Sequence, residues 1–93
     1  MKNKQIQPLA LVTGGGSGIG LAIARKFTEN GIRTLILGRN RGKLSSAKKM
    51  LGRRCEEIPF DLSQLSLLPG LVDDLVNRFG IPTILVNNAG VNM

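Results

Sequence analysis

One segment organises the whole sequence: Thr13-Gly14-Gly15-Gly16-Ser17-Gly18-Ile19-Gly20. It follows a short apolar run, Leu9-Ala10-Leu11-Val12, that is typical of a buried strand, and it opens a stretch with helical spacing. Glycine after a strand permits positive φ and lets the backbone pass close to a ligand. The helix that follows points unpaired N–H groups, and the positive end of its dipole, at the same place. Because a pyrophosphate satisfies both, strand, turn and helix together favour a dinucleotide site over a merely flexible turn.

The same segment predicts which residues contact the dinucleotide. Gly20 lacks a side chain that would hold the helix away from the strand beneath it. The expected contacts from this segment are Gly14, Gly16, Ser17, Gly18, Ile19 and Gly20.

The rest of the chain alternates between short apolar runs and apolar stripes with helical spacing. Strands are expected at 9–12, 34–37, 56–60 and 83–86. Three helices lie between them, and their apolar stripes are Ile19/Ala22/Ile23/Phe27, Leu44/Ala47/Leu51 and Leu68/Leu71/Val72/Leu75/Val76/Phe79. This alternation predicts an α/β fold, a Rossmann-type parallel sheet with helices on both faces.

Two strands bear on the order of this sheet. Pro59 interrupts the third strand, and a proline that cannot donate to its neighbour belongs at a sheet edge. The Rossmann order 3-2-1-4 puts the third strand there. It also puts Ile84-Leu85-Val86, which is wholly apolar, at the opposite edge, where an apolar strand invites further pairing. We therefore expect an incomplete sheet: a polar tail over residues 1–7 and the N-terminal half of a dinucleotide-binding domain over residues 8–93.

The end of the second strand predicts which dinucleotide binds. An acidic residue there would accept hydrogen bonds from both hydroxyls of the adenosine ribose and select NAD. The sequence has Gly38-Arg39-Asn40 instead, with no carboxylate. Arg39 offers a charge-assisted fork to a 2′-phosphate, which favours NADP, although an ordinary surface arginine at the start of a basic helix is the alternative.

Composition excludes several classes of site. The chain has 93 residues, one Cys and no His, Tyr or Trp. It therefore has no disulfide framework, no Cys- or His-based metal site and no imidazole for a catalytic triad, and we expect no metal. The N-terminal segment is polar, without the apolar core of a signal peptide, and no apolar run is long enough to span a membrane. We expect a cytoplasmic protein.

The net charge of +7 is concentrated in one region. Between Arg25 and Arg54 lie ten basic residues, opposed by Glu29 alone. Such a segment is usually a solvated helix face. A nucleic-acid binder is the alternative that we do not expect, because the chain lacks the aromatic platforms of single-strand binders and any known helix motif for duplexes.

Three motifs in order resemble the classical subgroup of the short-chain dehydrogenase/reductase family. The first is the Thr13-Gly14-x-x-x-Gly18-x-Gly20 spacing. The second is Asp61-Leu62 after the third strand, which in this family holds the adenine, and the third is Asn87-Asn88-Ala89-Gly90 after the fourth. The resemblance implies that Asp61, Leu62, Asn88, Ala89 and Gly90 contact the cofactor. Taken alone, Asp61 is a candidate N-cap for the third helix, and residues 88–90 are a candidate plain turn.

The resemblance also implies an activity, reversible hydride transfer between NADP(H) and a carbonyl or secondary alcohol. Many NADP-preferring members carry a basic residue where this chain has Ser17, so NAD use stays open. The family's catalytic Ser, Tyr and Lys follow the Asn-Asn-Ala-Gly motif, so we expect no catalytic residue here and a truncated, inactive cofactor-binding segment. The sequence looks most like 3-oxoacyl-carrier-protein reductases or gluconate and sugar dehydrogenases, which would make the substrate a 3-oxoacyl thioester or a sugar acid. Members commonly form homo-oligomers. The alternative is a stand-alone nucleotide-binding or regulatory module.

Overall fold

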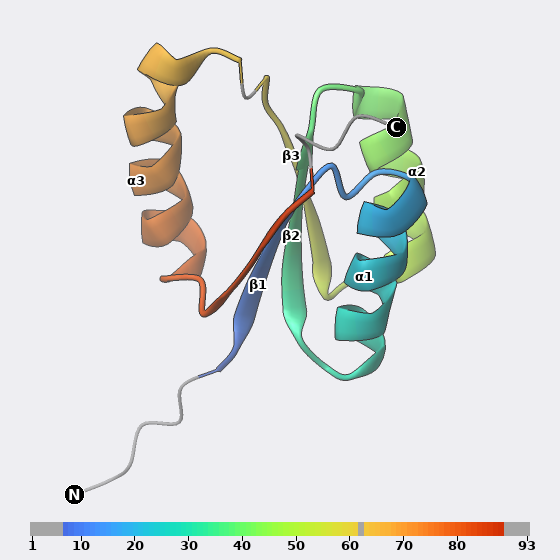
Figure 1. The fold of residues 1–93 in the computed structure, drawn as a ribbon. Coiled ribbons are helices and arrows are strands. Elements are labelled where there is room, and N and C mark those ends of the chain that lie inside the picture. The colour runs from blue at the N-terminus through green and yellow to red at the C-terminus, as the bar shows by residue number, and fades with distance from the viewer. Residues whose placement is uncertain (1–6, 62, 89–93) are drawn as a thin grey trace, which may run out of the picture.

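The computed structural model describes residues 7–61 and 63–88, which form one parallel sheet with helices on both faces (Figure 1). The strands are β1 (Leu9–Thr13), β2 (Arg33–Gly38), β3 (Cys55–Pro59) and β4 (Ile84–Asn87). All pairs are parallel, and the order is β3-β2-β1-β4. The predicted order 3-2-1-4 is confirmed, and the strand bounds differ from the predicted ones by about one residue.

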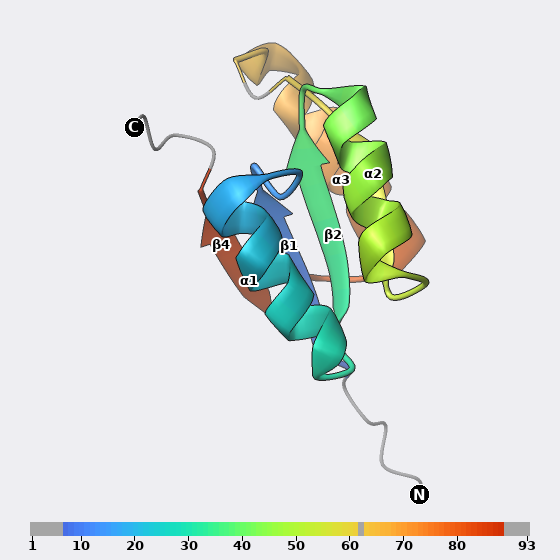
Figure 2. The same cartoon turned by 90° about the vertical axis from the view of Figure 1, so that its right-hand side faces the viewer.

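The helices divide between the two faces of the sheet. Helices α1 (Gly18–Glu29) and α2 (Arg41–Leu51) cover one face, and α3 (Leu68–Phe79), preceded by the short 3₁₀ helix η1 (Leu65–Leu67), covers the other (Figures 1 and 2). Successive side chains of β2 therefore point alternately to one helix layer and to the other. Ile36 packs under α1 and α2, whereas Leu35 and Leu37 pack with Leu75 of α3. Because both faces are covered, β2 is apolar at successive positions rather than at every second one.

The third strand confirms the expected place of its proline. Among the strands that the structure describes, β3 lies at an edge of the sheet and pairs with β2 alone, with Pro59 opposite Gly38 at the last position of the register. The next residue resumes the ladder, because the Phe60 N–H donates to the Gly38 carbonyl at 2.8 Å. The missing donor of Pro59 therefore costs the sheet no interior hydrogen bond.

The apolar stripe predicted for the first helix is wrong by part of a turn. Within the predicted stripe Ile19 is 59% exposed, Ala22 is exposed, and Phe27 is partly buried. The residues that face the sheet are the small ones, Gly20, Ala24 and Thr28. The helix lies so close to β1 that a Cβ on Gly20 would stand 2.1 Å from the Gly14 carbonyl oxygen. Closeness of approach, rather than hydrophobicity, therefore sets the buried face of α1.

The stripe on α3 is closer to the prediction. Leu75 is buried, and Leu71 and Phe79 pack against the same core cluster, whereas Val72 is 52% exposed. The predicted stripe on this 12-residue helix thus contains one misplaced residue, which lies at the border of the stripe.

The fourth strand leaves an apolar edge. Within residues 7–61 and 63–88, β4 pairs with β1 alone, and Leu85 is 67% exposed. The expectation that the sheet ends here on an exposed apolar strand matches this arrangement.

Substitution of Gly20 by Ala is expected to lower the free energy of unfolding by about 1–3 kcal/mol, because the new methyl group meets backbone atoms that cannot rotate away. Gly70→Ala is the matched control: nothing lies within 4 Å of a Cβ there, so the same change should stabilise α3 by about 0.5–1 kcal/mol. Chemical denaturation followed by circular dichroism measures both. Equal effects at the two sites would contradict the close approach of α1.

The exposed edge predicts self-association of the 93-residue chain. Sedimentation velocity over a concentration series should show oligomers that decrease in Leu85→Lys. The control is Val72→Lys, which adds the same charge at an exposed apolar position of α3, away from the strand edge, and should leave association unchanged. A monomer at all concentrations with cooperative unfolding would contradict the prediction.

Cys55 predicts a loss of stability at alkaline pH. Burial raises the pKa of this thiol from 9.0 to about 11, because the thiolate would lose its hydration. The stability that the buried neutral thiol gives the folded state is therefore complete below pH 9, and it is lost as the pH rises toward 11. The measurement is the difference in the free energy of unfolding between the wild-type chain and Cys55→Ala, which removes contributions shared by the two chains. That difference should change between pH 8 and about pH 10.5.

Candidate functional site

The glycine-rich turn bends sharply over the end of β1. Gly14 has φ of 67°, and its N–H donates to the Leu37 carbonyl at 2.7 Å, which ties the turn to β2. The backbone also presses on β2 at Gly15, where a Cβ would stand 2.6 Å from Cγ2 of Ile36. The turn therefore needs glycine at positions 14 and 15 for different reasons, a left-handed φ and a lack of space.

The N-terminus of α1 opens directly beyond this turn. Ser17 is the N-cap, yet its side chain makes no capping hydrogen bond, and the first turn of α1 holds no acidic residue. The first N–H groups of α1 therefore have no capping side chain from Ser17, and no acidic side chain of the first turn balances the positive end of the helix dipole. This is the electrostatic environment that an anionic group prefers.

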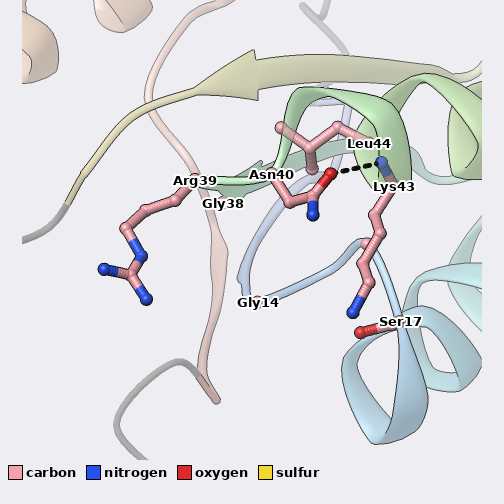
Figure 3. A pocket seen from close by; sticks show the side chains of 8 residues that line it. Gly14, Ser17, Gly38, Arg39, Asn40, Lys43 and Leu44 are labelled. Atoms are coloured by element: carbon pink, nitrogen blue, oxygen red, sulfur yellow. Dashed lines mark hydrogen bonds between the residues drawn. The ribbon is translucent and has the colours of Figure 1, made fainter.

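A cavity of about 560 Å³ lies between this turn and the start of α2 (Figure 3). Gly14, Gly16 and Ser17 line it from the turn. The opposite wall comes from the β2–α2 junction, namely Gly38, Arg39, Asn40, Lys43 and Leu44. Its volume falls in the range of small-molecule sites, and its described lining contains no carboxylate.

The β2–α2 wall is held by a helix cap. The Asn40 side-chain oxygen accepts a hydrogen bond from the Lys43 N–H at 2.9 Å, which starts α2. This capping hydrogen bond accounts for an asparagine at position 40 without any ligand. The cationic side chains on this wall are Arg39, which was predicted, and Lys43, which was not.

A second cavity of about 360 Å³ adjoins the first beyond Arg39, which lines both. Asp61 lies in this second cavity, and its carboxylate accepts hydrogen bonds from the Ser63 hydroxyl at 2.7 Å and the Ser63 N–H at 2.9 Å. These bonds, with a smaller effect of Arg39, hold the pKa of Asp61 below its ordinary value. Asp61 is thus an ionised acceptor at neutral pH.

Asp61 does not cap the third helix, so that alternative is wrong. α3 begins at Leu68 with Leu67 at the N-cap position, several residues after the carboxylate. Asp61 instead closes its own turn, in which the Gln64 N–H donates to the Asp61 carbonyl at 2.9 Å.

The end of β4 is bonded to the glycine turn. The Asn88 N–H donates to the Thr13 hydroxyl at 2.8 Å, and that hydroxyl lies 3.2 Å from the Asn87 side-chain oxygen. The Asn88 side-chain amide donates to the Gly14 carbonyl at 3.3 Å. The Asn-Asn pair therefore holds the turn in place from the neighbouring strand.

The structure brings most of the predicted site residues to one end of the sheet. Gly14, Gly16, Ser17 and Arg39 line the first cavity, and Asp61 lines the second. Gly18 and Ile19 are exposed on the first turn of α1, and Gly20 is buried beneath it. Leu62, Ala89 and Gly90 lie outside the described residues. Contact with a cofactor stays a prediction for all of these positions.

Lys43 is a charged residue of the cavity lining that was not predicted from the sequence. The sequence held no signal for it, because Arg39 precedes the N-cap Asn40 and helical spacing therefore does not relate Arg39 to Lys43. Over residues 7–61 and 63–88 no group of three His, Cys, Asp or Glu side chains could hold a metal ion. No helix in those ranges is both long and apolar enough to cross a bilayer.

Comparison with known proteins identifies related chains. The family model described as short chain dehydrogenase matches residues 8–93. Among curated proteins, the chain is 43% identical over 88 residues to the peroxisomal 2,4-dienoyl-CoA reductase of Danio rerio, an alignment that covers 90% of this chain and 29% of that one. The chain thus spans less than a third of that relative.

Solved structures of short-chain dehydrogenases and oxidoreductases also match the chain. A short chain dehydrogenase from Bacillus anthracis superimposes with a TM-score of 0.84 at 29% identity, over 92% of this chain and 36% of that one. A metagenomic short-chain oxidoreductase, solved in complex with NADP, superimposes with a TM-score of 0.83 at 34% identity, over 90% and 39%.

Proposed function

Because the chain belongs to the short-chain dehydrogenase/reductase family, we propose that it binds the adenosine half of a nicotinamide dinucleotide, NADP(H) in preference to NAD(H). When bound, the dinucleotide supplies or accepts a hydride. The whole protein would use it to interconvert a carbonyl and a secondary alcohol. The observation that carries this proposal is the cavity between the glycine turn and the start of α2, with cations on one wall and an uncapped helix N-terminus beside the other.

The pyrophosphate end fits the turn. The N–H groups at the start of α1 are free of side-chain caps, and glycine at positions 14 and 16 removes the side chains that would occupy the cavity. Approach of a phosphate there brings negative charge to the positive end of a helix dipole.

Arg39 supports NADP rather than NAD. It stands at the end of β2, in a cavity whose described lining carries no carboxylate to accept the two ribose hydroxyls. A guanidinium there is a charge-assisted donor to a 2′-phosphate. The metagenomic relative, whose fold this chain shares, was solved with NADP.

Binding, rather than turnover, is the part we assign to these 93 residues. The sequence contains no Tyr, the residue that resemblance to the family makes the general acid/base. For the substrate of the whole protein we favour an acyl thioester over a sugar acid, because the Danio rerio relative is named for a CoA thioester. A stand-alone nucleotide-binding module is not favoured, because the matching family consists of dehydrogenases.

Calorimetric titration of the 93-residue chain with AMP and with adenosine 2′,5′-bisphosphate tests the proposal. The two ligands differ only in the 2′-phosphate. A charge-assisted contact on a partly exposed surface predicts about tenfold tighter binding of the bisphosphate. Arg39→Ala should remove most of that advantage and leave AMP affinity nearly unchanged.

Arg53→Ala is the matched control for this titration. Arg53 lines a different cavity together with Pro8 and Leu9, at the start of β1 and away from the glycine turn. Loss of the same charge there should leave both affinities unchanged. Binding of neither ligand would refute the dinucleotide site, and equal binding of both would refute the preference for NADP.

A further inference from the structure

A third cavity, of about 430 Å³, opens at the end of the sheet opposite the glycine turn, where the strands begin. This is the lower end of the sheet in Figure 1, near the connections from α1 to β2 and from α2 to β3. Its lining includes three arginines, Arg33, Arg53 and Arg54, and contains no carboxylate among the described residues. The cavity therefore concentrates positive charge at a place that the dinucleotide site does not use.

Arg33 is held in place by two contacts. Its Nη2 donates to the Glu56 carboxylate at 2.9 Å, and its Cζ lies 5.1 Å from the centre of the Phe79 ring. The same carboxylate lies 4.0 Å from the Lys48 ammonium, so two cations share one negative charge. Because a guanidinium carries five N–H donors, the bond to Glu56 leaves Arg33 able to donate to a ligand in the cavity.

Arg53 and Arg54 are consecutive residues of the turn between α2 and β3. The Cys55 N–H donates to the Gly52 carbonyl at 3.1 Å, which closes the turn with the two arginines at its centre. Among the described residues, no side-chain hydrogen bond or ion pair engages either guanidinium. Arg54 also reaches toward the start of β2, because a Cβ on Gly31 would stand 3.9 Å from its Nε. Two uncompensated cations therefore line this cavity.

Arginines from two segments suit a ligand with two linked phosphates. A guanidinium donates two parallel N–H bonds to phosphate oxygens and keeps its charge throughout the physiological pH range. Because these side chains belong to exposed residues, one phosphate on one arginine gains little over water. Two linked phosphates bring acceptor oxygens to the start of β2 and to the α2–β3 turn at once. The volume of the cavity lies within the range of small-molecule sites.

We propose that this cavity binds a diphosphate anion, held by Arg33, Arg53 and Arg54. The anion is free pyrophosphate or the diphosphate ester of a small apolar group, since Pro8 and Phe79 line the cavity beside the arginines. The cavity shares no lining residue with the one at the glycine turn, so this inference does not depend on the proposed function.

Titration of the isotope-labelled 93-residue chain with inorganic pyrophosphate, followed by amide NMR, tests the inference. The Gly31 and Gly52 signals should shift saturably, because Gly31 lines the cavity and Gly52 belongs to the turn that carries two of the arginines. Arg54→Gln should weaken pyrophosphate binding by about five- to tenfold. Lys49→Gln is the matched control: it removes the same charge from the last turn of α2, outside the cavity lining, and should change the affinity by less than about twofold.

Isopentenyl diphosphate, used in a second titration, distinguishes the two sources of the anion. Tighter binding than pyrophosphate indicates an ester whose apolar group packs on Pro8 and Phe79, and equal or weaker binding indicates the free anion. AMP, which has a single phosphate, should shift the Gly31 and Gly52 signals much less than either diphosphate at the same concentration.

Three outcomes would overturn the inference. Shifts confined to Gly14 and Gly16 would place the anion at the glycine turn instead. Equal weakening by Arg54→Gln and Lys49→Gln, or an equal effect of sulfate at the same ionic strength, would reduce the response to the general positive field of the chain. The absence of any saturable shift would exclude a site. Circular dichroism of each variant confirms that its helices are intact, and AMP binding at the glycine turn is tested separately, so either proposal can fail alone.

Discussion

The close approach of α1 to the end of β1 is the constraint on which the site depends. At Gly20 the helix lies against the Gly14 carbonyl with no room for a methyl group. That contact turns small residues of α1 toward the sheet and directs the helix N-terminus over the glycine turn. The Asn88 side-chain amide, at the end of β4, also donates a hydrogen bond to that carbonyl. The N-terminus of α1 is therefore positioned by the fold itself, and a ligand that binds there would need little further ordering of the chain.

Most of the fold could be predicted from the sequence because its signals are local and consistent. Four apolar runs alternate with helical stripes, and Pro59 identifies an edge strand, so the order of the sheet follows from general rules of handedness and pairing. The buried face of α1 could not be predicted in this way. Hydrophobic periodicity predicts that Ile19 rather than Gly20 faces the sheet. The short distance between helix and strand instead places Gly20 there and leaves Ile19 exposed.

The same distinction separates the site residues that could be predicted from the one that could not. Gly14 and Arg39 stand at fixed offsets from the ends of strands, and strand ends are visible in the sequence. Lys43 acquires its place from a contact between Gly16 and the first turn of α2, segments that are more than twenty residues apart. In the sequence it is one basic residue among ten between Arg25 and Arg54, and only the packing of α2 on the turn distinguishes it.

The order β3-β2-β1-β4 also has a consequence for how the chain folds during synthesis. β1 is made first and lies inside the sheet, where it pairs with β2 along one side and with β4 along the other. The hydrogen bond between the Leu9 carbonyl and the Thr83 N–H spans 74 residues, so the second side of β1 stays open until β4 has emerged. At typical rates of translation that interval lasts several seconds, during which the central strand of the sheet carries an unpaired apolar edge. β1, the strand that leads into the glycine turn, is thus open to mispairing while the protein is being made.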